Sequence, residues 1–297
     1  MTMDDSPAQG DLGRAASWQP SSRELQRVTA RQRAARRRIA VASASSILVL
    51  GSLATVVVLS PGWTVVQRTF FDWAYGGEVL HLVARGMVTN IGLTIIASVL
   101  IAVIALLLAL ARTSRSAALT PFRLLATLYV DVFRGVPLLL VILLVGFGVP
   151  ALRLTGVTSS VLVLGTAAVV LTYSAYVAEV LRSGILSVHP SQRLAARSLG
   201  LTASQTMRHV VLPQAIKRVV PPLLNDLVAL LKDTGLVSIL GVIDAVRAGQ
   251  IEASRTFNYT PYVVAALLFL VITVPLTRYT DRVLARSIQR QNAQGAA

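Results

Sequence analysis

Cysteine is absent from this sequence of 297 residues, and charged residues make up only 14% of it. Without thiols the chain can form no disulfide, no thiolate nucleophile and no cysteine-ligated metal site. A soluble domain would carry about a quarter charged residues. The chain instead contains several apolar runs that reach the roughly 20 residues needed to cross a bilayer as a helix. We therefore predict an all-α polytopic membrane protein, and a soluble protein with one large core is disfavoured.

Motifs for nucleotide binding and metal catalysis are also absent. The sequence has no G-x-x-x-x-G-K-[ST] loop for phosphates and no H-E-x-x-H pair for zinc. Its three histidines, His81, His189 and His209, lie in separate connecting segments without the spacing of metal ligands. We predict no catalytic residue, no metal site and no cofactor bound by this chain, which is then not an enzyme.

Acidic residues are few as well, because 13 Asp and Glu stand against 28 Lys and Arg, for a formal net charge of +15. Such an excess can indicate nucleic-acid binding, but in a membrane protein it first indicates cytoplasmic loops. The apolar runs predict six transmembrane helices, at residues 39–60, 87–111, 137–154, 157–178, 219–242 and 261–277.

Six spans place both termini on one side of the membrane. That side holds 22 of the basic residues, whereas the opposite side holds only five. By the positive-inside rule, both termini and the polar segment at 181–220 lie in the cytoplasm. Topology explains the charge, so no nucleic-acid partner is predicted.

The N-terminal region divides into a tail and an anchor. Residues 1–38 have few apolar side chains, which predicts a disordered, basic cytoplasmic tail. Its run RQRAARRR, at 31–38, suits an anionic lipid surface. Residues 39–60 are longer than the core of a signal peptide, and we interpret them as a retained transmembrane anchor.

The polar segment between the fourth and fifth predicted spans has the pattern of two short helices around a glycine. Ser191 has the position of an N-cap for RLAARSL, and Gly200 stands where a left-handed turn ends a helix. Thr202 and Gln205 have capping-box spacing, which predicts a second helix ending near Leu212-Pro213. A plain surface linker is the alternative, but a linker does not need two capped helices. A short helix with small residues is suited to a groove on a partner.

The same segment carries a family resemblance. Ala195-Ala196, Gly200, Val210 and Leu212-Pro213 match the "EAA" loop of binding-protein-dependent ABC importer permeases, which reads E-A-A, three residues, G, nine residues, I, one residue, L-P. Three more stretches resemble the polar amino acid branch of that family: YVDVFRGVPLLL at 129–140, YSAYVAEVLRSGI at 173–185 and LPQAIKRVVPPLLNDLVALLKDTGLVSILGV at 212–242.

The resemblance covers residues 85–286 and implies the transmembrane domain of a type I ABC importer, with the coupling loop at 181–220. The family core has five spans. Residues 39–60 are then an additional N-terminal span, and residues 287–297 form a cytoplasmic C-terminal tail.

In that family the loop is the coupling helix, which docks in a groove of a cytoplasmic ATPase. The resemblance implies ATPase contacts by Arg193, Leu194, Ala195, Ala196, Ser198 and Gly200. Leu194 stands where the family has glutamate, and we expect an apolar contact there in place of a polar one. At the third position after a cap at Ser191, a glutamate would also complete a capping box.

The resemblance further implies partners and a location. The partners are a cytoplasmic ABC ATPase dimer that holds ATP and Mg, a second permease subunit (identical or homologous), an extracytoplasmic solute-binding protein and membrane lipid. The location is the prokaryotic cytoplasmic membrane, as a multi-pass protein. The implied substrate is a polar amino acid, and glutamate, glutamine, histidine, arginine and cystine all stay open.

Polar residues within the spans are candidates for the substrate path. Lys232 and Asp233 lie within the fifth predicted span, where a charge costs at least about 2.5 kcal/mol. Asn225 and Asp226 precede them by seven residues, so two polar stripes are predicted on that helix. An internal structural network is an equal alternative.

Three more candidates lie at the end of the fourth predicted span. Tyr173, Tyr176 and Glu179 are three residues apart and share a helix face. Arg182 continues the spacing, so Glu179 and Arg182 can instead form an intrahelical pair near the cytoplasmic interface.

An ion- or proton-coupled secondary transporter acting alone is the rival function. It would show paired acidic or histidine groups at the membrane midplane in repeated halves. This chain has one Lys-Asp locus and no visible repeat. Nothing positive indicates a non-transporting scaffold. We therefore predict the transmembrane subunit of an ATP-driven amino acid importer, coupled to a separate ATPase.

Overall fold

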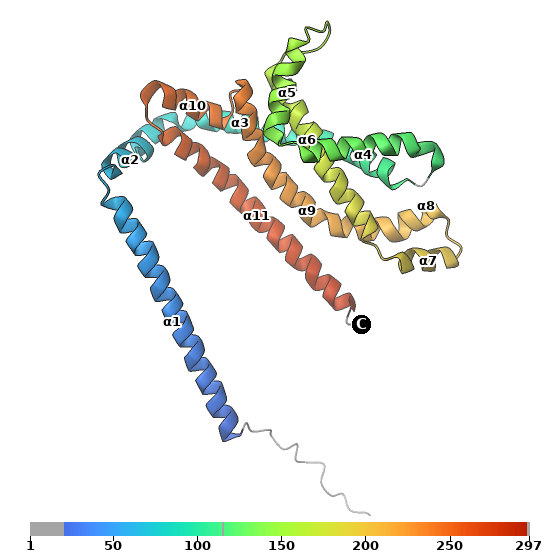
Figure 1. Cartoon of the computed structure of the whole chain (residues 1–297), viewed down its shortest axis with the longest axis horizontal. Helices are drawn as coiled ribbons and strands as arrows, with labels where there is room; N and C mark the ends of the chain where they lie inside the picture. The colour runs from blue at the N-terminus through green and yellow to red at the C-terminus, as the bar shows by residue number, and fades with distance from the viewer. Residues whose placement is uncertain (1–20, 115, 296–297) are drawn as a thin grey trace, which may run out of the picture. The chain divides into compact units, whose positions relative to one another are not determined.

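The computed structural model describes residues 21–114 and 116–295, which form helices and turns, with no strand among them. The chain separates into two compact units, Met1–Thr64 and Val65–Ala297, and each unit has helices of its own. Figure 1 shows the course of the chain through these helices.

The first unit contains one long helix, α1 (Ser22–Val58). Its segment Arg36–Val58 is long and apolar enough to cross a membrane, close to the predicted anchor. Residues 22–38, which were predicted to belong to a disordered tail, form the first turns of α1 in the structure. These residues are rich in Arg and Ala and contain no proline, so the helix extends back from its apolar half. Residues 1–20 of the predicted tail lie outside the described residues.

The second unit is a bundle of helices joined by short connections. Its helices are α2 (Trp63–Phe70, which starts at the boundary), α3 (Trp73–Thr113), α4 (Thr120–Gly135), α5 (Leu138–Ala151), α6 (Val161–Leu186), α7 (Pro190–Ser198), α8 (Ala203–Thr206), α9 (Leu212–Asp233), α10 (Ala245–Thr256) and α11 (Thr260–Gly295). Between them lie the 3-10 helices η1 (Ala117–Leu119) and η3 (Thr234–Leu240) and the π-helix η2 (Met207–Val211). Helix α3 packs against α6, α10 and α11, and α6 packs against α5 and α9. Figure 1 shows α7 and α8 at the end of α6 and α9 that lies opposite α10.

The predicted count of six spans is not confirmed. Among the described residues, four helical segments qualify alone by length and composition: Arg36–Val58, Trp63–Thr113, Val161–Leu186 and Thr260–Ala285. A fifth arises if the pair Ala117–Gly135 and Leu138–Ala151, bent by 106°, is one broken span. The residues of the predicted span at 219–242 form the later part of α9 followed by η3. They are not among the helical segments that are long and apolar enough to cross a membrane. The reason is composition, because α9 carries five charged side chains: Lys217, Arg218, Asp226, Lys232 and Asp233.

The second predicted span begins earlier than expected, at Trp73, because Asp72 caps the helix. The Asp72 carboxylate accepts a hydrogen bond from the Tyr75 N–H at 3.1 Å. It also accepts one from Asn258 Nδ2 at 3.2 Å, and the Asp72 N–H donates to Thr260 Oγ1 at 3.1 Å. The start of α3 is therefore fastened to the start of α11.

A buried polar network joins α3 to the start of α10. Asn90 is fully buried, and its Nδ2 donates to Asp244 Oδ2 at 3.0 Å and to Thr234 Oγ1 at 3.2 Å. Its Oδ1 accepts from the Ala245 N–H at 3.0 Å, and Asp244 Oδ1 caps α10 by accepting from the Arg247 N–H at 2.8 Å. Burial raises the pKa of Asp244, and hydrogen bonds from these donors offset part of that rise. Each buried group thus has a partner, as buried polar groups require.

We expect Asn90→Ala to destabilise the protein, because it leaves the Asp244 carboxylate and the Ala245 N–H buried without their partner. A lost hydrogen bond to a charged group costs about 1.5–3 kcal/mol. The thermal unfolding temperature in lipid nanodiscs should fall. Thr166→Ala is the control, because the Thr166 hydroxyl makes an exposed hydrogen bond to Leu162 O within α6 and takes no part in the network. An Asn90→Ala protein as stable as the wild type would contradict this role of the network.

Candidate functional site

The segment at 181–220 begins with the last turns of α6 and continues into α7, and the N-cap of α7 differs from the predicted one. His189 is the cap, and its Nδ1 accepts a hydrogen bond from the Ser191 N–H at 3.2 Å. Pro190 occupies the first helical position, where its missing N–H costs nothing. The predicted cap at Ser191 is therefore wrong. Leu194 consequently lies beyond the third helical position, where a glutamate could no longer complete a capping box.

The turn after α7 agrees with the prediction. Gly200 has a φ of +86°, in the left-handed region that favours glycine. The capping box is present, because the Thr202 N–H donates to Gln205 Oε1 at 2.8 Å and the Gln205 N–H donates to Thr202 Oγ1 at 3.2 Å. The two-helix pattern around Gly200 is therefore confirmed.

The second helix does not end near Leu212-Pro213 as predicted. It runs from α8 through η2 directly into α9. The Leu212 N–H bonds to Met207 O, five residues back, which is the wider turn of a π-helix. Pro213 then falls in the first turn of α9, where a helix does not need its N–H. The segment is thus continuous with α9.

Two arginines fasten this segment to the C-terminal end of α6. Arg193 of α7 donates from Nη2 to Ile185 O at 2.5 Å. Arg218 of α9 donates from Nη1 to Ser187 O and, at 2.9 Å, to Ser187 Oγ. The last carbonyls of a helix lack partners within it and carry partial negative charge, which a guanidinium neutralises. The same junction is packed by a cluster of buried apolar residues, namely Ile185, Val188, Val211 and Ala215.

The predicted ATPase contacts divide into an inner and an outer set. Ala196 is buried and the guanidinium of Arg193 bonds to α6, so both residues position α7 within its own subunit. The other predicted residues are exposed: Leu194, Ala195, Ser198 and Gly200.

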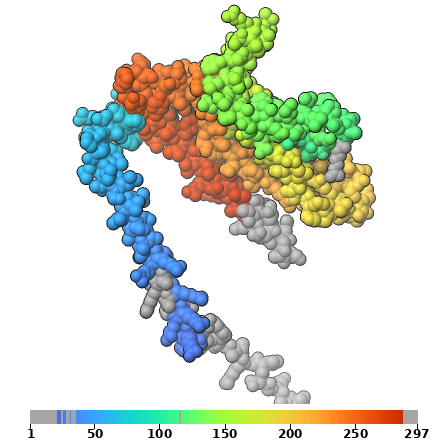
Figure 2. All heavy atoms as spheres, in the orientation of Figure 1, coloured from blue at the N-terminus to red at the C-terminus, as the bar shows by residue number. Residues whose placement is uncertain are grey.

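Sequence reasoning missed two exposed residues of the same region, Arg197 and Leu199. The structure reveals them because only the buried position of Ala196 shows which side of α7 points outward. We call Leu194, Ala195, Ser198 and Leu199 the outward face of α7. Figure 2 shows α7, in yellow, at the surface of the second unit.

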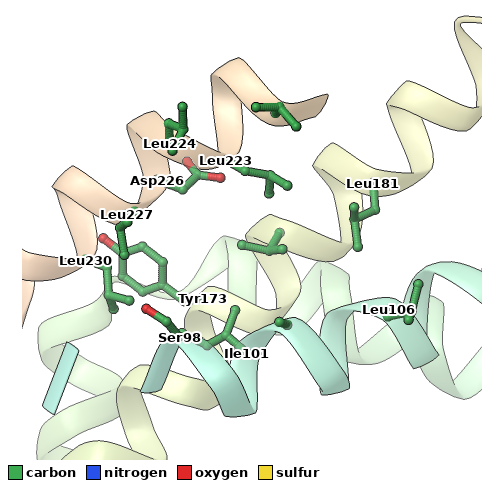
Figure 3. A pocket seen from close by; sticks show the side chains of 13 residues that line it. Ser98, Ile101, Leu106, Tyr173, Leu181, Leu223, Leu224, Asp226, Leu227 and Leu230 are labelled. Atoms are coloured by element: carbon green, nitrogen blue, oxygen red, sulfur yellow. The ribbon is translucent and has the colours of Figure 1, made fainter. Parts of the chain in front are cut away.

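A cavity of about 490 Å³ lies between α3, α6 and α9. Its wall is mainly apolar, with side chains such as Ile101 and Leu106, and its polar atoms come from Ser98, Tyr173 and Asp226. Figure 3 shows the Asp226 carboxylate and the Tyr173 ring pointing into one space, with Ser98 and Ile101 on the α3 side. The cavity therefore combines an apolar body with a few polar groups, as ligand sites do.

Asp226 has an unpaired atom in this wall. Its Oδ2 is buried and has no hydrogen-bond partner in the part of the chain that the structure describes. Tyr173 is engaged, since its Oη donates to Asp233 Oδ2 at 2.7 Å. Nor does a metal-ligand group of three or more His, Asp or Glu occur within residues 21–114 and 116–295. A buried carboxylate oxygen without a donor is unfavourable, so the cavity suits a ligand with an ammonium or another N–H group.

The four candidates on α9 lie on two different faces of the helix. Asn225 and Lys232 are exposed, whereas Asp226 and Asp233 face the cavity and α6. The two predicted stripes are thus distinct, and only one of them borders this cavity. Tyr176 of α6 is 40% exposed and lies edge-on to Tyr173, with ring centroids 6.2 Å apart.

Glu179 lies in an ion cluster outside the cavity wall. The predicted pair with Arg182 is present at 2.6 Å. Arg112 of α3 also binds Glu179 at 2.6 Å, and Arg134 of α4 lies 3.8 Å from it. Sequence reasoning missed both, because no local pattern shows that three separate helix ends meet. The cluster joins α3, α4 and α6, and it contains the predicted intrahelical pair.

Known proteins resemble most of the second unit. A family model described as "Binding-protein-dependent transport system inner membrane component" matches residues 115–289. The probable glutamine ABC transporter permease protein GlnM of Bacillus subtilis is 39% identical over 173 residues, which cover 56% of this chain and 78% of that protein. The arginine transport system permease protein ArtQ of the same organism is 30% identical over 199 residues, covering 67% and 89%.

A solved structure is similar as well. It is described as the crystal structure of an amino acid ABC transporter with histidines, and it matches with a TM-score of 0.67 and 33% sequence identity. The match covers 72% of this chain and 98% of that chain. The family model spans α4 to α10 and most of α11, and it includes the whole of α7 to α9.

We expect Arg112→Gln to weaken the packing of α3 on α6, because it breaks a 2.6 Å ion pair whose side chains are only 10% and 19% exposed. The loss should be about 1.5–3 kcal/mol of unfolding free energy. Arg134→Gln is the matched control, since Arg134 is 43% exposed and 3.8 Å from Glu179, and it should cost less than about 1 kcal/mol. Thermal unfolding in nanodiscs measures both variants. Equal effects would contradict the assignment of Arg112 as the link between the helices.

Proposed function

Because the chain belongs to the family of binding-protein-dependent transport system inner membrane components, we propose that it forms the membrane path for the import of a polar amino acid. It is the transmembrane subunit of an ABC importer, a transport component in which hydrolysis of ATP is the task of a partner ATPase. Such permeases work with an ATPase and a solute-binding protein. The alternative of a secondary transporter acting alone is not favoured, because the relatives are ABC permeases.

The observation that carries the substrate proposal is the cavity with its unpaired carboxylate. Asp226 offers a buried acceptor to the ammonium that every amino acid carries, and the surrounding leucines accept an apolar stem. The names of the relatives support this class, since they refer to glutamine and arginine. Tyr173 and Asp233 form the adjacent part of the path, and Tyr176 extends it along α6.

The exposed stripe of α9, which is Asn225 and Lys232, and the ion cluster around Glu179 have other roles in this proposal. Asn225 and Lys232 are exposed on α9, where a second permease subunit, identical or homologous, would complete the path. Their amide and ammonium can bind a carboxylate, which the Asp226 side of the helix cannot. In this proposal the role of Glu179 is to join α3 and α6 through its ion pairs.

Coupling is assigned to α7. Two ATPase subunits, which hold ATP and Mg, would bind the cytoplasmic segment of two permeases, and an extracytoplasmic solute-binding protein would deliver the amino acid. The exposed residues Leu194, Ala195, Ser198 and Gly200 would contact the ATPase. Arg193 and Ala196 act behind them, by fixing α7 to the end of α6.

We expect Asp226→Asn to reduce ATP-driven uptake of its amino acid about 10- to 100-fold, because the ammonium loses a charged acceptor worth about 1.5–3 kcal/mol. The measurement is uptake of a radiolabelled amino acid panel by proteoliposomes that contain the chain, its ATPase and its solute-binding protein. Asp281→Asn is the control, since Asp281 is exposed on α11.

Two results would contradict this proposal. Unchanged uptake by Asp226→Asn would remove the cavity from the path. Uptake that continues without ATP hydrolysis, driven by a proton or sodium gradient, would contradict the importer mechanism itself.

The orientation can be tested without removing any native thiol, because the sequence has no cysteine. Gln192→Cys is exposed on α7 and Ser254→Cys is exposed on α10. We propose that both termini and α7 are cytoplasmic, so a membrane-impermeant maleimide should label the α10 cysteine in intact spheroplasts. It should label the α7 cysteine only after permeabilisation. The reverse pattern would invert the proposed topology.

A further inference from the structure

The outward face of α7 is apolar at its two edges. We propose that this face docks in an ATPase groove that has an apolar floor and an acidic rim, and that it thereby selects its own ATPase. This inference rests on the proposed function, since it specifies the chemistry of the partner that α7 is assigned to bind.

Helical geometry puts the two leucines on one side of α7. Successive residues are turned by about 100°, so Leu194, Ser198, Ala195 and Leu199 fall in that order within an arc of about 140°. The opposite side carries Ala196, which is buried against the bundle. Leu194 and Leu199 are therefore the edges of the face, and two small residues lie between them.

Both leucines are unusually open to solvent. Leu194 is 67% exposed and Leu199 is 82% exposed. Burying a leucine that is exposed stabilises a contact by about 1.5–3 kcal/mol, so two such side chains form the centre of an interface. The small side chains of Ala195 and Ser198 let the backbone of a partner approach between them.

The charge of the whole segment that carries this face indicates the charge of the partner's rim. From Ser183 to Asn225 the chain contains no aspartate or glutamate. Arg197, Arg208 and Lys217 are exposed in this segment, whereas Arg193 and Arg218 bond to the end of α6. A complementary partner must therefore be acidic at its edge, and such complementarity steers association.

The combination of exposed leucines and a basic segment discriminates between ATPases. In the resembling family the position of Leu194 holds a glutamate, and a groove that receives a glutamate must offer donors or a cation there. Against this chain, those donors or that cation would be buried against Leu194 and would lack a partner. A cation would also be next to the arginines of this segment. Both effects are unfavourable. We infer that this chain binds poorly to an ATPase whose groove is built for the glutamate.

The test is the affinity of the full-length chain in nanodiscs for the ATPase of its own importer, measured by biolayer interferometry at 0.1 and 0.5 M NaCl. Leu194→Glu and Leu199→Glu should each weaken binding about 10- to 100-fold. Leu152→Glu is the matched control, because Leu152 is also exposed, at 65%, but lies in the connection between α5 and α6. It should leave the affinity unchanged. The wild type should bind more weakly at high salt, because the contacts of its basic side chains with the acidic rim are screened, whereas the loss of affinity caused by each leucine variant should stay the same, as apolar contacts are not screened.

A second arm uses the ATPase of an importer whose permease carries the glutamate. Wild-type protein should bind it at least about tenfold more weakly than Leu194→Glu does, and this exchange of preference would support the proposal. If Leu194→Glu binds the native ATPase as well as the wild type does, the apolar docking is overturned while the importer function stands. If the wild type neither binds its ATPase nor changes its hydrolysis rate, the coupling proposal fails as well.

Discussion

The C-terminal end of α6 is the constraint on which the functional part of this structure depends. Its last carbonyls receive hydrogen bonds from Arg193 of α7 and Arg218 of α9. At Gly184, just before this end, a side chain would collide with Val219, so α6 and α9 approach closely only because the residue is glycine. Tyr173 lies about three turns earlier on the same helix. A force on α7 therefore reaches the cavity wall through a capped, continuous helix, and no flexible loop intervenes.

Polar groups inside the bundle differ in whether the chain already supplies their partners. Asn90 and Asp244 satisfy each other, and Glu179 is surrounded by arginines, so both networks hold helices together. Among the residues that the structure describes, none donates to the buried Oδ2 of Asp226, which lies at a cavity. Charges within a membrane helix are unfavourable unless they are paired or used. The sequence presents all of these residues alike, as polar interruptions of apolar runs, and only their contacts separate the structural ones from the one that is free to bind.

Local patterns predicted what local physics decides. The Gly200 turn and the Thr202–Gln205 box depend on residues a few positions apart, and both were predicted correctly. Two local predictions were nevertheless wrong, because His189 caps α7 in place of Ser191 and because the helix continues past Leu212-Pro213. The other errors arose where a distant contact or a longer context decided. The early start of α3 is supported by Thr260, and the Glu179 cluster needs Arg112 from another helix. By composition alone α9 does not qualify as a membrane span. A charged helix crosses a membrane only if other groups cover its polar side. Sequence alone does not show what covers it.

The corrected cap of α7 changes the meaning of its departure from the family pattern. With a cap at Ser191, a glutamate at position 194 would stabilise the helix itself, and leucine would be a loss. With His189 as the cap, position 194 lies beyond the capping turn and its side chain points outward. Helix stability then makes no demand on the residue there. An exposed leucine gains nothing from water, so its value must come from a surface that covers it. If α7 has the proposed coupling role, the choice between leucine and glutamate at this position is a property of its interface with the ATPase.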